Sequence, residues 1–309
     1  MRVVLIVDEL TLHSELRGEV WGEDIDAQGL QRAFARKRGI TCCDILTMNL
    51  CLEFQRRGLP LDYEVAIHFV ASPFLIQKAI NVLFFQQFYW YTVRRFRTLL
   101  KRFDHVICPS MMIANRFREV TFFPLAVDPD AFRPVTTIDD EFMTEIIFIG
   151  NAYIRGIETY REFLSPATKY RLAIYGNRWQ EDRYAEFRNW WRGVLPIANM
   201  SNAYSGARVG LSIHHASHRG VFQFVTARPY QMLSCGCPTI ADSSAALEAL
   251  LPSIDCGIQT VKDKLETEAA LHAVLVDAAL RAELVSKGRA YIIKHHTWDL
   301  RVDQLLSIL

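Results

Sequence analysis

Short runs of apolar, largely β-branched residues recur along the sequence and alternate with segments of helical periodicity. The first run, residues 3–7, is apolar without interruption, which is typical of a strand buried on both faces of a parallel sheet. Similar runs follow at residues 65–69, 81–85 and 105–108. Alternation of such strands with helices predicts β–α–β units and a doubly wound α/β fold.

A helix is expected after the first strand, because Leu30, Ala33 and Phe34 recur at helical spacing. We expect it to end at Gly39, behind the basic cluster at residues 36–38. Cations suit the carboxyl end of a helix, and glycine suits the position that follows it.

A proline-rich segment interrupts the alternation. Residues 123–134 carry Pro124, Pro129 and Pro134, which indicates a linker. Leu300, Leu305 and Ile308 fall near one face of a final helix. Strand-like runs resume after the linker at residues 146–149, 172–175, 209–214, 239–241 and 258–261. We therefore expect two α/β lobes, residues 1–134 and 135–294, followed by a C-terminal helix at residues 295–309.

The charge balance and the cysteines narrow the class of protein. The 309 residues include 35 Lys and Arg against 34 Asp and Glu, a net charge of +1, which disfavours a general polyanion binder but allows a local basic patch. The seven cysteines lack zinc-ligand spacing, and the apolar start lacks a signal-peptide cleavage site. We expect reduced thiols and a cytoplasmic protein. The apolar stretch 79–91 is too short and too polar to span a bilayer.

Strand ends in the second lobe carry residues suited to a ligand, since ligands of open parallel sheets bind outside the carboxyl ends of the strands. Glycine turns follow two expected strands and carry Gly150 with Asn151 and Gly176 with Asn177. Arg155 lies just after the first turn. These turns predict one side of a ligand site.

A third strand end leads through a loop with His214 into a helix expected to begin near Arg228 and Pro229. Pro229 suits a first helical position, and Thr226 suits the N-cap. Free N–H groups at this helix start, together with Arg228, favour a diphosphate. No GxGxxG follows the first strand and no P-loop motif is present, so dinucleotide oxidoreductases and P-loop NTPases lose support.

Several segments resemble those of one enzyme family. TARPYQMLSCGCPT resembles the "R-x-F-E-x-L-A-C-G" segment of CgeB/YkvP-like glycosyltransferases, which belong to the GT-B superfamily and are related to family 4. FFPLAVDPDAFRP resembles their hinge, IIFIGNAYIRG the opening of their donor domain, and HHTWDLRVDQLL their closing helix. The resemblance is strongest from about residue 79 to the end.

The resemblance implies two Rossmann-like lobes with a cleft between them and a C-terminal helix that crosses back to the first lobe. The second lobe would hold a nucleotide-diphosphate sugar and the first lobe the acceptor, as in a hexosyl- or pentosyltransferase. Arg155, Arg228 and Thr226 would lie by the diphosphate. No metal or other cofactor is expected, and no obligatory protein partner is inferred.

The resemblance also suggests where the rest of the donor would lie. Gly176, Asn177, Val194 and Leu195 would be near the nucleobase and ribose. We also expect the loop with His214 to contact a donor phosphate or the sugar.

Two glutamines depart from the family-4 pattern, in which two glutamates with the same spacing contact the donor sugar and the ribose. Gln223 and Gln231 stand at these positions. An amide still accepts and donates hydrogen bonds, so Gln231 can meet ribose hydroxyls. A charge-assisted bond, worth about 1.5–3 kcal/mol against roughly 1 kcal/mol for a neutral one, is lost. Either the donor differs from the usual ones or the site is weakened.

Three residues of the first lobe are candidates for the base that an inverting transfer needs. His68 follows the strand-like residues 65–67, while Asp8 follows the first strand and Asp24 lies near the start of the first helix. A retaining reaction would need no such base, and Arg155 and Arg228 would then stabilise the leaving group. His214 and His218 lack nearby carboxylates or thiolates in the sequence, which disfavours a metal site.

A basic, aromatic helix is expected between Phe88 and Phe103. Its cations suit an anionic membrane or a nucleic acid. Its apolar residues share one face, however, which favours a core-facing helix with a solvated basic side. These apolar residues are Val93, Phe96, Leu99, Leu100 and Phe103.

Other interpretations remain open at this point. The two glutamines fit a catalytically silent sugar-nucleotide-binding protein, and the basic helix fits a glycosyltransferase that modifies hydroxylated bases in nucleic acid. A sugar-phosphate isomerase or epimerase is a further alternative. The acceptor can be a glycan, a lipid-linked sugar, a small molecule or modified nucleic acid, and the sequence leaves the sugar, the base and the stereochemical outcome open.

Overall fold

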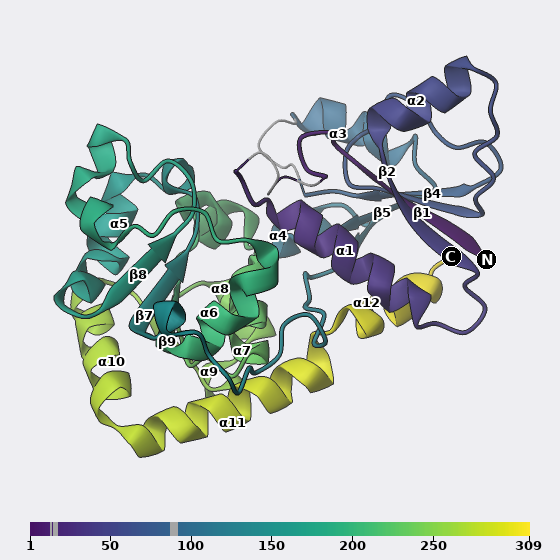
Figure 1. Ribbon diagram of the computed structural model, residues 1–309. Coiled ribbons are helices and arrows are strands. Elements are labelled where there is room, and N and C mark those ends of the chain that lie inside the picture. The colour runs from purple at the N-terminus through teal and green to yellow at the C-terminus, as the bar shows by residue number, and fades with distance from the viewer. Residues whose placement is uncertain (13, 15–17, 87–91) are drawn as a thin grey trace. The chain divides into compact units, whose positions relative to one another are not determined.

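The computed structural model describes residues 1–12, 14, 18–86 and 92–309, which form two compact units. Unit 1 comprises residues 1–14, 21–128 and 298–309, and unit 2 comprises residues 15–20 and 129–297. The part of the expected basic helix from Phe88 to Tyr91 lies outside the described residues. Each unit contains one parallel sheet with flanking helices, as Figure 1 shows.

The sheet of unit 1 is parallel throughout, in the order β2-β1-β3-β4-β5-β6 among the described residues. Its strands are β1 (Arg2–Val7), β2 (Cys42–Thr47), β3 (Val65–His68), β4 (Ile80–Phe84), β5 (His105–Cys108) and β6 (Val120–Phe122). The four strands expected from apolar runs are confirmed. The two edge strands were missed, because β2 is only half-buried along its length and β6 is very short.

The helices of unit 1 cover this sheet. They are α1 (Gly22–Ala35), α2 (Met48–Arg56), α3 (Val93–Leu100), α4 (Met111–Arg116) and α12 (Trp298–Leu306). The expected end of α1 at Gly39 is wrong, since the helix stops at Ala35. Arg36 follows as the C-cap residue and pairs with Asp299 at 2.7 Å, and Gly39 supplies a positive φ of 89° in the turn beyond.

The C-terminal helix α12 packs on α1 within unit 1 (Figure 1). A Cβ at Gly29 of α1 would stand 2.4 Å from Cδ1 of Trp298, so only glycine allows this approach. Val302 and Leu305 are buried on the same helix. Leu300, which the sequence pattern placed on the apolar face, is exposed. The packing face is therefore rotated from the expected one towards Trp298.

Unit 2 has a five-stranded parallel sheet in the order β11-β10-β9-β7-β8. Its strands are β7 (Thr144–Ile149), β8 (Leu172–Tyr175), β9 (Ala207–Ser212), β10 (Thr239–Asp242) and β11 (Ile258–Val261), which confirms the predicted strands. Its α-helices are α5 (Ile157–Phe163), α6 (Met200–Gly206), α7 (Ala227–Ser234), α8 (Ala245–Leu250), α9 (Ser253–Cys256), α10 (Lys264–Val276) and α11 (Ala278–His295). Its 3₁₀-helical segments are η3 (Asp140–Phe142), η4 (Ala152–Ile154), η5 (Ser165–Lys169), η6 (Asp182–Trp190) and η7 (Ile197–Asn199), and η8 (His218–Phe222) is a π turn.

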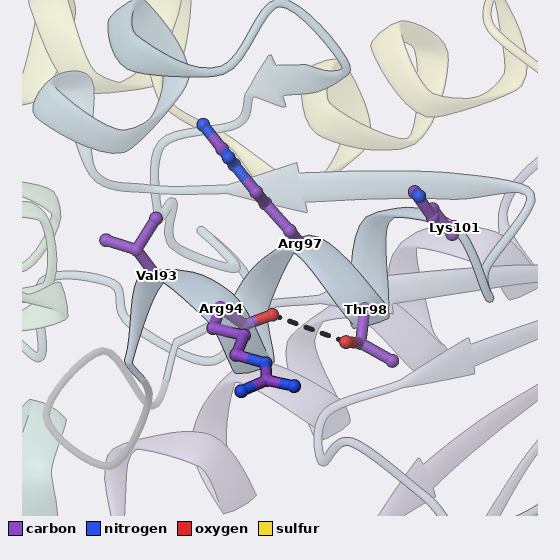
Figure 2. A pocket seen from close by; sticks show the side chains of 5 residues that line it. All are labelled: Val93, Arg94, Arg97, Thr98 and Lys101. Carbon is purple, nitrogen blue, oxygen red and sulfur yellow. Dashed lines mark hydrogen bonds between the residues drawn. The ribbon is translucent and has the colours of Figure 1, made fainter.

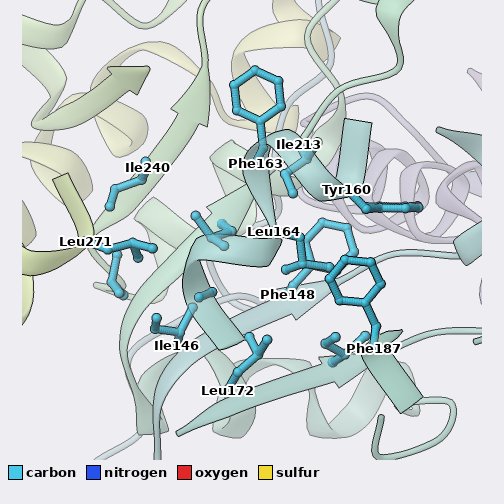
Figure 3. Packing of buried hydrophobic residues seen from close by; sticks show 14 of the residues in the cluster. Ile146, Phe148, Tyr160, Phe163, Leu164, Leu172, Phe187, Ile213, Ile240 and Leu271 are labelled. Carbon is cyan, nitrogen blue, oxygen red and sulfur yellow. The ribbon is translucent and has the colours of Figure 1, made fainter. Parts of the chain in front are cut away.

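A cluster of buried aromatic and aliphatic side chains packs against this sheet (Figure 3). Phe148 of β7 meets Tyr160 of α5 with ring centroids 5.9 Å apart. Trp179 lies 4.8 Å from the Tyr160 ring and donates its indole N–H to the carbonyl of Gly150 at 2.8 Å. The turn after β7 is thereby fixed to the core beneath it.

The boundary between the units falls between Asp128 and Pro129, inside the proline-rich segment. Asp128 is fully buried and accepts hydrogen bonds from Arg32 of α1 and from Arg36, the residue after this helix, which ties it to unit 1. None of the helices in the described part of the chain combines the length and the hydropathy that a membrane span requires.

Candidate functional site

Two glycine turns meet at the carboxyl edge of the unit 2 sheet. Gly150 follows β7 and Gly176 follows β8. The Gly150 N–H donates to the Tyr175 carbonyl at 2.8 Å, and the Asn177 N–H donates to Oδ1 of Asn151 at 2.8 Å. The four residues expected to line the donor, Gly150, Asn151, Gly176 and Asn177, are thus together.

The segment before Val194 and Leu195 runs beside the second turn. The Gly176 N–H donates to the Gly193 carbonyl at 2.9 Å, and the indole N–H of Trp191 donates to the Gly176 carbonyl at 2.8 Å. Val194 is half-buried and Leu195 is buried. Both residues therefore follow directly on a segment that is hydrogen-bonded to the Gly176 turn.

Arg155 is buried, with an exposed fraction of 6%. Its Nε donates to the carbonyl of Ile213, and its guanidinium carbon lies 5.6 Å from the centroid of the Phe148 ring. Its Nη1 is buried and has no hydrogen-bond partner among the described residues. The guanidinium is thus held in place while one of its donors is left for a ligand.

Helix α7 begins at Ala227, so Arg228 is its second residue. Thr226 occupies the N-cap position as expected, but its hydroxyl makes no capping hydrogen bond. Its Oγ1 is buried without a partner among the described residues. Pro229 is the third helical residue rather than the first, a position still within the first turn, where the missing N–H costs no helical bond.

Arg228 and Arg155 lie close enough for their charges to repel. Burial and, next, the charge of Arg155 lower the pKa of Arg228 to about 9. The Nη1 atom of Arg228 is also buried without a partner in the described chain. Two buried guanidinium groups with unpaired donors are of a chemistry that can bind an anion.

His214 belongs to the same cluster. Its Nδ1 lies 2.6 Å from Oδ1 of Asp242, the last residue of β10. Arg219 contacts the other carboxylate oxygen at 3.2 Å. The sequence analysis missed Asp242 and Arg219, although an acidic residue directly after the strand-like run 239–241 was an available signal for Asp242.

The two glutamines lie on either side of the start of α7. Gln231 is buried and stands three residues after Arg228, so both side chains share one side of the helix. Gln223 follows η8 in a left-handed conformation with φ 48° and ψ 68°. Non-glycine residues adopt this conformation uncommonly, and such strain clusters at functional sites.

The neighbouring histidines are engaged with the protein. His215 Nδ1 lies 2.6 Å from Oγ of Ser217, and the His218 ring meets Phe224 edge-on at 4.9 Å. Burial, followed by the nearby His214 and His215, lowers the pKa of His218 to about 3. Within the described ranges, no three His, Cys, Asp or Glu side chains are grouped as metal ligands would be.

In unit 1, His68 is fully buried at the end of β3. Its Nδ1 lies 2.9 Å from Oγ of Ser72 and its Nε2 lies 3.0 Å from Oδ1 of Asn81. Burial lowers its pKa to about 4. Both ring nitrogens of His68 are thus engaged by the protein and the side chain has no exposed surface, an arrangement that favours a structural role over the predicted role as a base.

The two candidate aspartates differ in their surroundings. Asp24 is buried in α1, where its carboxylate accepts from the Ser14 backbone at 3.3 Å and from Nε2 of Gln28 at 2.9 Å, so it also stabilises the local fold. Asp8 is half-buried just after β1 and accepts from the Leu10 N–H at 2.8 Å. Of the three predicted candidates for a base, Asp8 alone keeps an accessible carboxylate.

Asp26 was missed by the sequence analysis. It is buried in α1, and its Oδ1 has no partner among the described residues. Burial and then the nearby Glu23 raise the pKa of Asp26 well above its usual value. No periodic signal distinguishes such a buried acid from the solvated acids of the same helix.

A shallow pocket of about 530 Å³ lies along α3 (Figure 2). Its lining includes three cations of one helix side, Arg94, Arg97 and Lys101. All three are exposed. Phe96, Leu99 and Phe103 are buried as expected for a core-facing helix, whereas Val93 is 44% exposed, contrary to expectation.

A family model described as "Glycosyl transferase-like" matches residues 155–307. No curated protein matches the chain. Several solved structures resemble it over essentially their whole length. The sucrose-phosphate synthase from Thermosynechococcus elongatus has a TM-score of 0.71 and 14% identity, over 100% of this chain and 98% of that one.

Two further glycosyltransferases are similar. An alpha-glucosyltransferase in complex with UDP and a mismatch-containing 13-mer DNA has a TM-score of 0.69 and 14% identity, over 100% of this chain and 98% of that one. AviGT4, a glycosyltransferase involved in avilamycin A biosynthesis, has a TM-score of 0.67 and 12% identity, over 99% and 96%. These likenesses confirm the predicted GT-B fold of two Rossmann-like α/β units.

Proposed function

We propose that the chain is a glycosyltransferase whose unit 2 binds a nucleotide-diphosphate sugar. One observation carries the proposal: Arg155 Nη1, Arg228 Nη1 and Thr226 Oγ1 are buried without partners among the described residues, around the first turn of α7. A buried polar group without a hydrogen bond costs roughly 1–3 kcal/mol. Diphosphate oxygens would accept from all of these groups and from the free N–H groups of the helix.

The charges support the same ligand. Arg155 and Arg228 repel each other in the unliganded protein, and two phosphate charges would remove that repulsion. In the transfer, the bond between the sugar C1 and the phosphate oxygen breaks and a bond from C1 to the acceptor oxygen forms. The acceptor loses its proton, and the nucleoside diphosphate leaves with the bonding electrons. The two guanidinium groups would stabilise this developing charge, so we propose a reaction that needs no metal.

The remaining parts of the donor follow from the same arrangement. The turns of Gly150 and Gly176, with Val194 and Leu195, would receive the base and ribose, and Gln231 would meet the ribose hydroxyls. The GT-B fold and the family match over residues 155–307 support sugar transfer. We further propose that the chain belongs to the CgeB/YkvP-like group and that the sugar it transfers is a hexose or a pentose.

A thermal-shift panel of UDP-, GDP-, ADP- and TDP-sugars tests the donor site. A ligand at a hundred times its dissociation constant stabilises the folded protein by about 2.7 kcal/mol. We expect one base to give a clear upward shift of Tm and the free nucleosides a much smaller one. No shift with any member would contradict the proposal. If a nucleotide sugar binds but no nucleoside diphosphate is released when acceptors are added, the chain is a sugar-nucleotide-binding protein without catalytic activity.

A nucleic acid carrying a hydroxylated base is a second candidate for the acceptor. Arg94, Arg97 and Lys101 line one shallow pocket along α3, and these three cations and Arg95 are exposed. The alpha-glucosyltransferase of similar fold is in complex with DNA. Arginine forks bind phosphates in bidentate fashion, and each neutralised phosphate makes binding more sensitive to salt. Binding of duplex DNA that does not weaken with salt would dispose of this candidate.

A further inference from the structure

The His214 side chain is clamped by a carboxylate in the interior of unit 2. His214 is 1% exposed, and its Nδ1 lies 2.6 Å from Oδ1 of Asp242. The backbone N–H of His214 also donates to this carboxylate, at 3.0 Å and 2.9 Å to its two oxygens. Arg219 Nη1 contacts Oδ2 at 3.2 Å. Asp242 therefore receives donors from a ring, a backbone amide and a guanidinium.

These contacts assign the proton on Nδ1. An ionised carboxylate only accepts hydrogen bonds, so Nδ1 must carry a hydrogen whatever the charge of the ring. The other ring nitrogen, Nε2, is buried and has no partner among the described residues. The orientation of the ring is thus fixed, with Nε2 left for a ligand.

The groups around Nε2 of His214 indicate which kind of ligand would bind there. Arg155 donates through Nε to the carbonyl of Ile213, the residue before His214, and its Nη1 has no partner in the described chain. Arg228 Nη1 is equally without a partner. If Nε2 carried no hydrogen, its lone pair could accept a hydrogen bond from either guanidinium group. No hydrogen bond joins His214 Nε2 to Arg155 Nη1 or to Arg228 Nη1. One anion with several oxygens would satisfy all three, provided that Nε2 carries a hydrogen.

We propose that His214 binds the donor's diphosphate as an imidazolium held by Asp242, so that binding of a nucleotide sugar takes up a proton. This inference rests on the proposed function of unit 2 and adds a proton-linked contact to it. His214 touches the ligand, and Asp242 is a positioning residue that acts through it. The proton comes from solvent and returns to solvent when the nucleoside diphosphate departs.

The groups around His214 with a shifted pKa are His215, His218 and Arg228. Burial lowers the pKa of His218 to about 3, and burial with the nearby Arg155 and Arg219 lowers that of His215, so both remain neutral. The pKa of Arg228, lowered to about 9, leaves it cationic below about pH 8. Imidazole is the side-chain type that serves as a proton acceptor near neutral pH in proteins. We assign the proton to His214 because its Nδ1 faces Asp242 and its Nε2 has no partner among the described residues.

Isothermal titration calorimetry measures the proton directly. Wild-type protein is titrated at about pH 7.5 with UDP-glucose, GDP-glucose and ADP-glucose, in buffers of equal pH but different ionisation enthalpy. A sugar diphosphate is the probe because, unlike a free terminal phosphate, it has no ionisation near neutral pH. We expect a positive uptake of up to one proton. Affinity should weaken as the pH rises from about 6.5 to 8, by at most about tenfold per unit.

Two substitutions separate the ring's charge from its shape. His214→Asn keeps an N–H that can reach Asp242 but removes Nε2, and we expect weaker binding with no proton uptake. His214→Gln retains a donor without a titratable group, so its binding should be independent of pH. Asp242→Asn should bind with less proton uptake at the same pH, since a neutral amide no longer favours the imidazolium. His272→Asn, at an exposed position of α10, is the matched control and should titrate as wild type.

The outcomes distinguish this inference from the proposed function. Binding of a nucleotide sugar without proton uptake in wild type would overturn the imidazolium contact and leave the donor site standing. Equal uptake in wild type and His214→Asn would assign the proton to another group and would likewise overturn it. Absence of binding by every probe would overturn both. Melting curves of the unliganded variants identify any that fail to fold. In that case the proton uptake and the pH dependence of affinity, both measured on the wild-type protein, test the inference without the variants.

Discussion

The backbone of Gly176 lies against the carbonyl group of Gly150, so closely that a Cβ at Gly176 would stand 2.3 Å from the Gly150 oxygen. Gly176 also has a φ of 136°, which other residues rarely adopt. Trp179 and Trp191 donate to the two glycine carbonyls from the other side. The strand ends that bear the candidate donor site are therefore joined backbone to backbone.

Gly176→Ala should destabilise the protein more than an alanine at a glycine that has space. Gly193 is the control, because its φ of 90° is also in the positive range that other residues rarely adopt, while a Cβ there would meet nothing within 4 Å. We expect Gly176→Ala to lower the free energy of unfolding by about 2 kcal/mol more than Gly193→Ala, since the added methyl clashes with backbone. Urea denaturation of both variants measures the difference. Equal stabilities would show that the close approach of the two turns is not maintained in solution.

The strands of unit 2 were predictable because most contain a short apolar run that is buried, such as residues 146–148 of β7 and all of β8. The polar edge strand Cys42–Thr47 escaped prediction, since a strand that is half-buried on each side has no such signature. The end of α1 at Ala35 was equally hidden, because it depends on pairing of Arg36 with residues far along the chain, Asp128 and Asp299.

The residues of the candidate site also divide into those that could be predicted from the sequence and those that could not. Arg155 and Arg228 could be proposed from strand ends and a helix start, which are local features, and the resemblance to a known family supported them. Asp242 could not be linked to His214 without the strand order, which pairs β9 with β10. The burial of His68 and Asp24 could not be predicted from the sequence. A polar residue at a strand end or helix start gives the same sequence pattern whether its side chain faces solvent or the core.

Arg228→Ala should weaken diphosphate binding selectively. A hydrogen bond to a charged group contributes about 1.5–3 kcal/mol, so the dissociation constant of UDP should rise by roughly tenfold to a hundredfold. Binding of uridine should be nearly unchanged, and the unliganded variant should be no less stable than wild type, because a charge that Arg155 repels has been removed. Calorimetry with both ligands measures this. Arg208→Ala, an exposed cation of β9, is the control, and equal losses for UDP and uridine would argue against a phosphate contact.

Gln231→Glu should strengthen donor binding if Gln231 meets the ribose. A carboxylate makes charge-assisted bonds to hydroxyls, worth about 1.5–3 kcal/mol against roughly 1 kcal/mol for the amide, so affinity should improve several-fold. The gain should vanish with a 2′,3′-dideoxy analogue, which lacks those hydroxyls. Calorimetry with the two nucleotides separates the cases. An affinity that the substitution leaves unchanged would remove Gln231 from the site.

Arg94→Ala with Arg97→Ala tests the nucleic-acid candidate. Each lost phosphate contact should reduce the slope of log affinity against log salt by about 0.9, so the double variant should lose a slope of about two with duplex DNA. Arg56→Ala with Arg57→Ala is the matched control, since these exposed cations of unit 1 already pair with Glu53. Fluorescence anisotropy at several salt concentrations gives the slopes. If the α3 variant instead loses binding to vesicles of anionic lipid while DNA binding is unaffected, the partner is a membrane surface.

His68 should make the fold sensitive to acid. Its pKa is lowered from 6.5 to about 4 in the folded protein, because the buried ring is kept neutral. Between these two pH values the unfolded chain binds a proton that the folded chain refuses, so acid favours unfolding; above about pH 6.5 neither state binds it and the effect disappears. The free energy of unfolding should therefore fall on acidification through this window, by up to roughly 3 kcal/mol from this residue.

His218, whose pKa is also lowered, acts in the same direction, so the informative quantity is the difference between wild type and His68→Gln. The variant should be less stable at neutral pH and lose less stability on acidification, whereas His272→Gln, exposed on α10, should follow the wild-type curve. Urea denaturation at a series of pH values measures all three, and parallel curves for wild type and His68→Gln would mean that the ring is not buried in its neutral form.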